Sequence, residues 1–305
     1  MGAEHTRDLE RLAVRARAGL VREIDHSGAW DEDPVWREAF AEVPRHLFVP
    51  YYFVGVPGGY ERLWGEHPDP KRRERWLRGA YADEPLATRL RDGDRVLEIG
   101  AGTGYNAALL AHRVGAGNVT SVDLDPEVAE SARAHLAAAG HPTTVVTGDG
   151  ARGWPERAPY DRIMATCALR AVPGEWLGQC APRGRILAPL STGIVALDVA
   201  EDGQRAQGRF LHTSAYFMAL RGGVGREPEP SLSGLPHPVL RDELFRFLLT
   251  LTSGRREPRD VLELWEREGR PERERFGVTV RGDGRQWAWL DDPEGPHTWE
   301  LPGTP

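Results

Sequence analysis

VLEIGAGTGYNAALLA, residues 96–111, places three glycines between a short apolar run and a helical pattern. The apolar run predicts a buried strand, and the spacing that begins at Tyr105 predicts a helix to Val114. Glycines at such a turn let the backbone approach a ligand, and the first N–H groups of the helix lack partners within it. The stretch therefore predicts a nucleotide-type binding loop.

The pattern of strand followed by helix continues beyond this loop. A helix is expected at residues 126–139, where Asp125 acts as a cap and Pro126 starts the first turn. Further strands are expected at residues 118–125, 143–150, 160–166 and 184–190. Because alternating strands and helices require parallel crossovers, the fold class is a doubly wound α/β sheet.

The flanking regions have different patterns. Residues 5–24 and 34–42 predict amphipathic helices, and residues 55–79 read as a long ordered loop. After Leu190 the pattern predicts antiparallel strands, a Gly- and Pro-rich linker at 222–238, two helices and a hairpin at 276–292. We therefore expect an N-terminal helical and substrate-side region at 1–90, a core at 91–221 and a smaller α+β extension at 222–305.

Composition limits the classes of partner. The net charge of −7 argues against a nucleic-acid partner. The two cysteines, Cys167 and Cys180, share no CxxC spacing, so neither a metal site nor a disulfide framework is indicated. No apolar run approaches ~18 residues, and the N-terminal end is charged. The expectation is a soluble, cytoplasmic protein with no membrane partner.

The spacing of the glycines selects between two ligand classes. A dinucleotide site needs G-x-G-x-x-G, whereas Gly100, Gly102 and Gly104 give G-x-G-x-G with Tyr105 at the last position. Glu98 precedes the first glycine by two residues. The E-x-G-x-G-x-G form resembles the first motif of S-adenosylmethionine-dependent methyltransferases, in which a carboxylate suits a cationic ligand and would repel a pyrophosphate.

Two more acids follow strands at the same edge of the expected sheet. Asp123 can accept both ribose hydroxyls, and Asp149 can accept the adenine amino group. Each acid alone could equally be a strand-end turn or a helix cap, and for Asp125 the cap is preferred. The expected S-adenosyl-L-methionine site comprises Glu98, Gly100, Gly102, Gly104, Asn106, Asp123, Leu124, Asp149 and Gly150.

Segments around this loop resemble one family in order along the chain. EVPRHLFVP (42–50), YADEPL (81–86), the glycine loop, GDG (148–150), APYDRI (158–163) and PRGRILAPL (182–190) resemble protein-L-isoaspartate O-methyltransferases. The resemblance covers about residues 39–190 and implies a Rossmann-like class I methyltransferase fold. It also implies methylation of an Asp or isoaspartyl carboxylate, whose ester can cyclise to a succinimide.

The segment after Leu190 is longer than the corresponding segment of a simple repair enzyme of this family. It resembles the extended actinobacterial homologues that act in ribosomal peptide maturation, which implies a modified substrate such as a macrocyclic precursor peptide. Two alternatives stay open: a general isoaspartate repair enzyme, and a cofactor- and peptide-binding protein without catalysis. Trp287, Trp289 and Trp299 are either peptide-binding aromatics or core residues.

The chain also departs from the family before the glycine loop. Only Ala87 to Asp94 separates the YADEPL block from Arg95, so the family's hydroxyl-bearing substrate loop has no counterpart and no catalytic residue is assigned. The substrate-side candidates are Tyr81, Asp83, Thr166 and Cys167. We expect Cys167, which has no evident His partner, to line a pocket. We also expect omitted residues near Arg89, Leu90 or Arg91, with a true deletion as the alternative.

Overall fold

The structure, a computed structural model, describes residues 3–26, 33–56, 59–81, 90–221, 232 and 235–302. It contains two compact units. One comprises residues 1–94, 101–120 and 126–145, and the other comprises residues 95–100, 121–125 and 146–305. The division at residues 90 and 221 stays a prediction. In the described residues no helix is long and apolar enough to cross a membrane.

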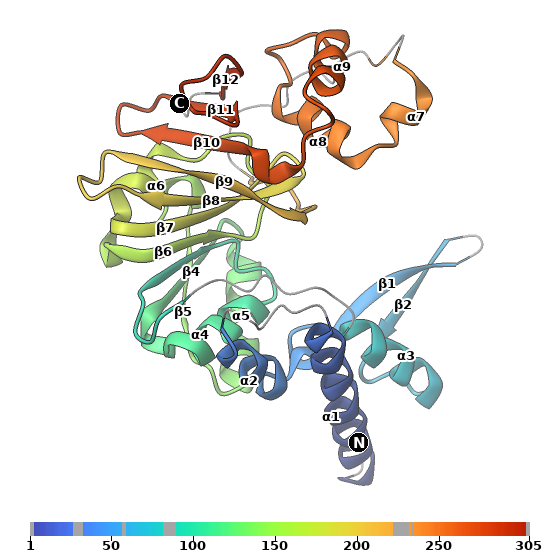
Figure 1. Cartoon of the computed structure of the whole chain (residues 1–305). Helices are drawn as coiled ribbons and strands as arrows, with labels where there is room; N and C mark the ends of the chain where they lie inside the picture. The colour runs from blue at the N-terminus through green and yellow to red at the C-terminus, as the bar shows by residue number, and fades with distance from the viewer. Residues whose placement is uncertain are drawn as a thin grey trace. The chain divides into compact units, whose positions relative to one another are not determined.

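A ten-stranded sheet has the strand order β12-β11-β10-β9-β8-β7-β6-β3-β4-β5 (Figure 1). β3 pairs in parallel with β6, and β6 with β7. From β3 the chain passes to β4 and β5 on one side and then to β6 on the other, so β3 and β6 flank the topological switch point. This is the edge at which doubly wound sheets bind ligands. The bounds are β3 Val96–Ile99, β4 Val119–Asp123, β5 Thr144–Thr147, β6 Tyr160–Ala165 and β7 Cys180–Leu190.

The connecting helices begin and end where the sequence predicts. α4 spans Tyr105–Val114 between Gly104 and Gly115, which both have positive φ. α5 spans Pro126–Ala138, and Gly140 just beyond it also has positive φ, a conformation that glycine adopts at low cost. The remaining connections are α6 Gly174–Gln179 and the 3₁₀ helices η2 Ala116–Asn118, η3 Gly150–Arg152 and η4 Pro155–Arg157.

The C-terminal strands extend the same sheet instead of forming a separate layer. β8 Gly193–Val199 and β9 Arg205–Ser214 run antiparallel to their neighbours, as expected. β10 Phe276–Arg281 then pairs with β9, so the expected appendage continues the sheet through β11 Gln286–Leu290 and β12 Thr298–Glu300. Pairing with β10 satisfies backbone groups that an open β9 edge would expose. The helices here are α7 His237–Leu240, α8 Glu243–Leu251, α9 Pro258–Arg267 and η5 Arg273–Arg275.

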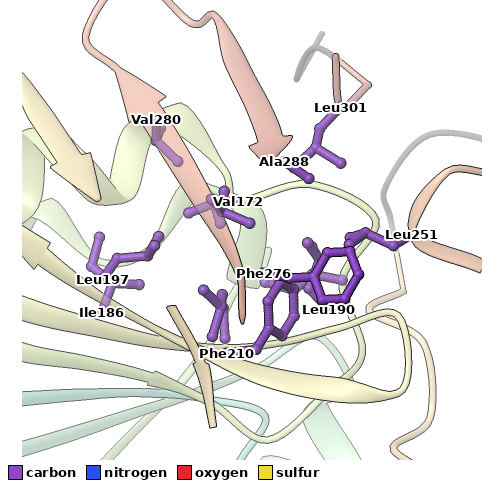
Figure 2. Close-up of a cluster of buried hydrophobic side chains, with 14 of the residues drawn as sticks. Val172, Ile186, Leu190, Leu197, Phe210, Leu251, Phe276, Val280, Ala288 and Leu301 are labelled. Atoms are coloured by element: carbon purple, nitrogen blue, oxygen red, sulfur yellow. The ribbon is translucent and has the colours of Figure 1, made fainter. Parts of the chain in front are cut away.

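Side chains from the extension belong to the main core of this unit. Figure 2 shows Phe276, Val280 and Ala288 among residues of β7, β8 and β9. Trp289 and Trp299 are only 2% and 4% exposed, which places them in the core. The extension therefore covers the β9 edge of the sheet and stabilises it through apolar burial.

The first unit contains α1 Ala3–Asp25, α2 Val35–Glu42 and η1 Arg45–Leu47. The loop expected at residues 55–79 is instead a hairpin of β1 Tyr51–Val56 and β2 Gly59–Trp64, followed by α3 Pro70–Ala80. Asp69 caps α3 by accepting a hydrogen bond from the Lys71 N–H at 2.9 Å. The sequence does not indicate this helix, because the charged run KRRERW shows little apolar periodicity. Only one narrow face of the helix is buried.

Candidate cofactor site

The glycine loop leaves β3 with backbone angles that favour glycine. Gly100 has φ +96°, and its N–H donates to the Val122 carbonyl at 2.8 Å. A Cβ at Gly100 would lie 2.7 Å from Thr166 Oγ1, whereas a Cβ at Gly102 would meet nothing within 4 Å. The loop is therefore closely packed at Gly100, where it leaves the strand, and open two residues later at Gly102, as a ligand-binding loop requires.

The loop ends at the N-terminus of α4 in the first unit. Gly104 has φ +86° and contributes no side-chain cap to the helix. A Cβ there would lie 3.2 Å from the Ala132 carbonyl oxygen of α5, so glycine allows the two helices to pack closely. Asn106 lies in the first turn of α4, where the positive end of the helix dipole favours an anionic or polar ligand group.

Glu98 lies in β3 with no exposed surface. Its carboxylate accepts a hydrogen bond from the Ser121 hydroxyl of β4. Since the side chain is fully buried, its influence on a bound cation would pass through its charge and through the backbone of the loop. The direct contact expected from the sequence stays a prediction.

Asp123 stands at the end of β4, one strand from the glycine loop, and is 8% exposed. One carboxylate oxygen accepts the Asp125 N–H at 3.1 Å, which fixes the side chain at the strand end. The Arg221 guanidinium lies 3.8 Å from Asp123 and 3.6 Å from Asp125. Leu124, 41% exposed, follows directly. This arrangement offers a fixed carboxylate beside an accessible apolar side chain.

Asp149 and Gly150 follow β5. The Asp149 carboxylate caps η3 through the Ala151 N–H at 3.0 Å, so the capping role considered as an alternative is present. Gly150 is held by the Trp176 indole, which donates to its carbonyl at 2.9 Å. Recognition of an adenine amino group by Asp149 stays a prediction.

Thr166 and Cys167 follow β6 on the other side of the switch point. Thr166 Oγ1 donates to the Gly100 carbonyl at 2.6 Å, which joins the ends of β3 and β6. Burial, with a smaller contribution from the Asp123 charge, raises the pKa of the Cys167 thiol to about 12. A thiol that stays protonated at neutral pH is a poor nucleophile, in agreement with a pocket-lining role.

The substrate-side candidates before the loop are described only in part. Tyr81 is 4% exposed, and its hydroxyl pairs with His46 Nδ1 at 2.9 Å, which favours a structural role. Asp83 and the junction at Arg89 lie outside the described residues. The Cα separations that would test for omitted residues involve this junction, so omission and true deletion both stay predictions.

The geometry fits an S-adenosyl-type cofactor. In the second unit, Gly100 and the carboxylates of Asp123 and Asp149 follow the consecutive strands β3, β4 and β5 at the switch point. Such carboxylates can accept hydroxyl and amino hydrogens, and the loop leaves room for the chain of a cationic ligand. Thr166 then borders the loop from β6.

Comparison with known proteins agrees with this geometry. The family model "Protein-L-isoaspartate(D-aspartate) O-methyltransferase (PCMT)" matches residues 15–216, which is more than half of the chain. The chain belongs to this family. Protein-L-isoaspartate O-methyltransferase 2 of Archaeoglobus fulgidus is 36% identical over 229 residues, covering 71% of this chain and 94% of the relative. The corresponding protein of Methanopyrus kandleri is 34% identical over 230 residues, covering 72% and 98%.

A solved protein-L-isoaspartate O-methyltransferase has the same fold. The two structures superpose with a TM-score of 0.57 at 22% sequence identity, over 90% of this chain and all of the other. Family membership makes this protein a methyltransferase with S-adenosyl-L-methionine as its methyl donor. The family match ends at residue 216, so the strands β10–β12 lie beyond it.

Two features of this region were missed from the sequence. The Arg221 contact with Asp123 and Asp125 joins residues far apart along the chain, and no local pattern signals it. The His46–Tyr81 pair joins the two family blocks at 42–50 and 81–86. The presence of a polar residue in each block was the available signal for that pair.

Proposed function

We propose that this protein transfers a methyl group from S-adenosyl-L-methionine to the carboxylate of an isoaspartyl or aspartyl residue in a protein or peptide. The observation that carries the proposal is the glycine turn at Gly100 with Asp123 fixed at the next strand end, in a chain that belongs to this family. Asp123 would hold the ribose, and the backbone at Gly100 would accommodate the amino acid part.

The reaction needs little acid–base help. A carboxylate is ionised at neutral pH, so no strong general base is required. The bound cofactor supplies an electrophilic methyl group on a sulfonium. The residues of the chain orient the two reactants and exclude water. Since Cys167 is a buried thiol with a raised pKa, transfer is direct and no methylated cysteine intermediate forms.

The product ester determines the consequence for the substrate. Methanol leaves a methyl ester more readily than hydroxide leaves a carboxylate, so the next backbone nitrogen can close a five-membered succinimide. Hydrolysis of that ring returns aspartate or isoaspartate, which is repair. Retention of the ring as an aspartimide is maturation of a modified peptide.

The test compares linear peptides that differ only in one residue, isoaspartate or aspartate, with the purified protein and S-adenosyl-L-methionine. Mass spectrometry should show a gain of one methyl group on the isoaspartyl peptide, followed by loss of methanol. Absence of methylation on both peptides, with S-adenosylhomocysteine still bound, would contradict the proposal and support a cofactor- and peptide-binding protein without catalysis.

A second candidate is maturation of a ribosomal peptide, with a macrocyclic precursor as substrate. Two observations favour it: the strands β10–β12 beyond the family match, and the short connection between Leu86 and Arg95. A shorter substrate loop would accommodate a constrained peptide that a full loop would obstruct. Methylation of a macrocyclic peptide and not of its linear form would support this candidate, and the reverse preference would support repair.

A further inference from the structure

The hairpin of β1 and β2 carries an exposed aromatic face. Tyr51, Phe53 and Tyr60 are 48%, 59% and 81% exposed. In the strand register Phe53 stands opposite Arg62, and Tyr51 stands opposite Trp64, so all five side chains lie on one face. We call these five residues the aromatic face.

The opposite face of the hairpin is anchored. Leu63 is fully buried, and the Tyr52 hydroxyl donates to the Arg75 carbonyl of α3 at 2.9 Å. Glu61 forms ion pairs with Arg72 and Arg75, also in α3. Figure 1 shows the two strands extending beside this helix. The aromatic face is therefore held in place without being covered.

Arg62 gives the aromatic face a positive charge. Its guanidinium lies 4.1 Å from the centre of the Tyr51 ring and 5.8 Å from that of Trp64. No carboxylate among the described residues forms an ion pair with it within 4.0 Å. Stacked arginine beside exposed tyrosine and phenylalanine and a half-buried tryptophan is typical of binding hot spots.

The hairpin also joins the two blocks that carry the family resemblance. His46 lies in η1, just before β1, and Tyr81 follows α3. Their hydrogen bond at 2.9 Å joins the residues just before the hairpin to the end of α3. Tyr81 is the first residue of the YADEPL block, so the hairpin is fixed next to the start of the predicted substrate segment.

We infer that the aromatic face docks an extended segment of the polypeptide substrate, with apolar side chains against Tyr51, Phe53 and Tyr60 and an acidic side chain near Arg62. This inference rests on the proposed function, since the family acts on polypeptides. A two-stranded sheet leaves each strand one unpaired edge, and an extended peptide can add its backbone there. The net charge of −7 disfavours nucleic acid as the occupant.

The test uses two fluorescent linear peptides of about a dozen residues, each with a central isoaspartate and one glutamate. One peptide has valine and leucine flanks and the other has serine flanks. Binding is measured by anisotropy with S-adenosylhomocysteine present, and methylation is measured separately. The variants are Phe53→Ser/Tyr60→Ser and Arg62→Gln. Val14→Ser, which changes a 48% exposed side chain of α1, is the matched control.

We expect the double variant to weaken binding of the apolar-flanked peptide at least tenfold, with unchanged S-adenosylhomocysteine affinity and thermal unfolding. Arg62→Gln should weaken binding of both peptides, because each carries the glutamate, and Val14→Ser should match wild type. Equal affinity of wild type and the double variant, or no binding by wild type, would overturn the inference. So would a dimer that the double variant converts to monomer without any change in peptide affinity, since the occupant is then a second copy.

The two proposals fail separately. Binding of the apolar-flanked peptide that depends on Phe53 and Tyr60, without any methylation, would refute the proposed function and keep the docking surface. Methylation by wild type with an unchanged KM in the double variant would refute the docking surface and keep the proposed function.

Discussion

Replacement of Asp123 by alanine tests whether this carboxylate binds the ribose of the cofactor. A carboxylate that accepts two ribose hydroxyls makes two charge-assisted hydrogen bonds, at about 1.5–3 kcal/mol each. Water will replace part of this in the variant, because the site lies at a strand end. We expect a net loss of about 2–3 kcal/mol, or about a 30- to 150-fold weaker affinity for S-adenosylhomocysteine.

The ion pair between Asp123 and Arg221 is too weak to produce such a loss through unfolding. Arg221 is exposed and lies 3.8 Å away, so its ion pair with Asp123 adds under about 1 kcal/mol. Asp123→Asn keeps the shape and one acceptor but removes the charge, and should weaken binding about tenfold. Asp198→Ala is the control, because it removes an exposed carboxylate that pairs with Arg185 at 2.7 Å.

Isothermal titration calorimetry with S-adenosylhomocysteine measures these affinities directly. Thermal unfolding of each variant without ligand checks that the fold is kept. An affinity of Asp123→Ala equal to that of wild type and Asp198→Ala would refute the ribose assignment.

Three further expectations test other parts of the structure. Gly100→Ala should destabilise the protein and weaken cofactor binding more than Gly102→Ala, because only its Cβ meets an atom, Thr166 Oγ1 at 2.7 Å; equal unfolding temperatures and affinities would contradict this. Phe276→Ala, at a side chain 1% exposed, should cost about 3–5 kcal/mol in chemical denaturation, and a cost under about 1 kcal/mol would show that the extension is not core. The pKa of Cys167 is raised from 9.0 to about 12, so the unfolded chain ionises first and this thiol's contribution to stability falls as pH rises from about 9 to 12. Cys167→Ala should flatten the decline in stability measured over that range, and iodoacetamide at pH 8 should label Cys167 only after unfolding.

The core of the fold followed from the sequence because its signals are local. The glycines at residues 100, 102 and 104 need positive φ, and the structure has it at all three. α4 occupies the predicted residues 105–114, because apolar periodicity and flanking glycines define both of its ends.

The parts that were missed depend on distant partners. The pairing of β10 with β9 joins Gly277 to Arg209, and no pattern within either strand specifies that neighbour. Burial of Trp289 and Trp299 depends on the same pairing. The many charged residues of α3 leave little apolar periodicity to indicate a helix. Arg221 lies near Asp123 only because the folded sheet brings them together. Tertiary packing decided each of these features.

A carboxyl methyl ester is the expected product of this chain, with the cofactor held by the glycine loop. The most direct measurement incubates the protein, S-adenosyl-L-methionine with a radiolabelled methyl group, and a linear isoaspartyl peptide. Mild base then releases label from any ester as volatile methanol. We expect wild type to transfer base-labile label to the peptide and Asp123→Ala to need far more cofactor to do so. Absence of label on the peptide, or label that resists base, would contradict it.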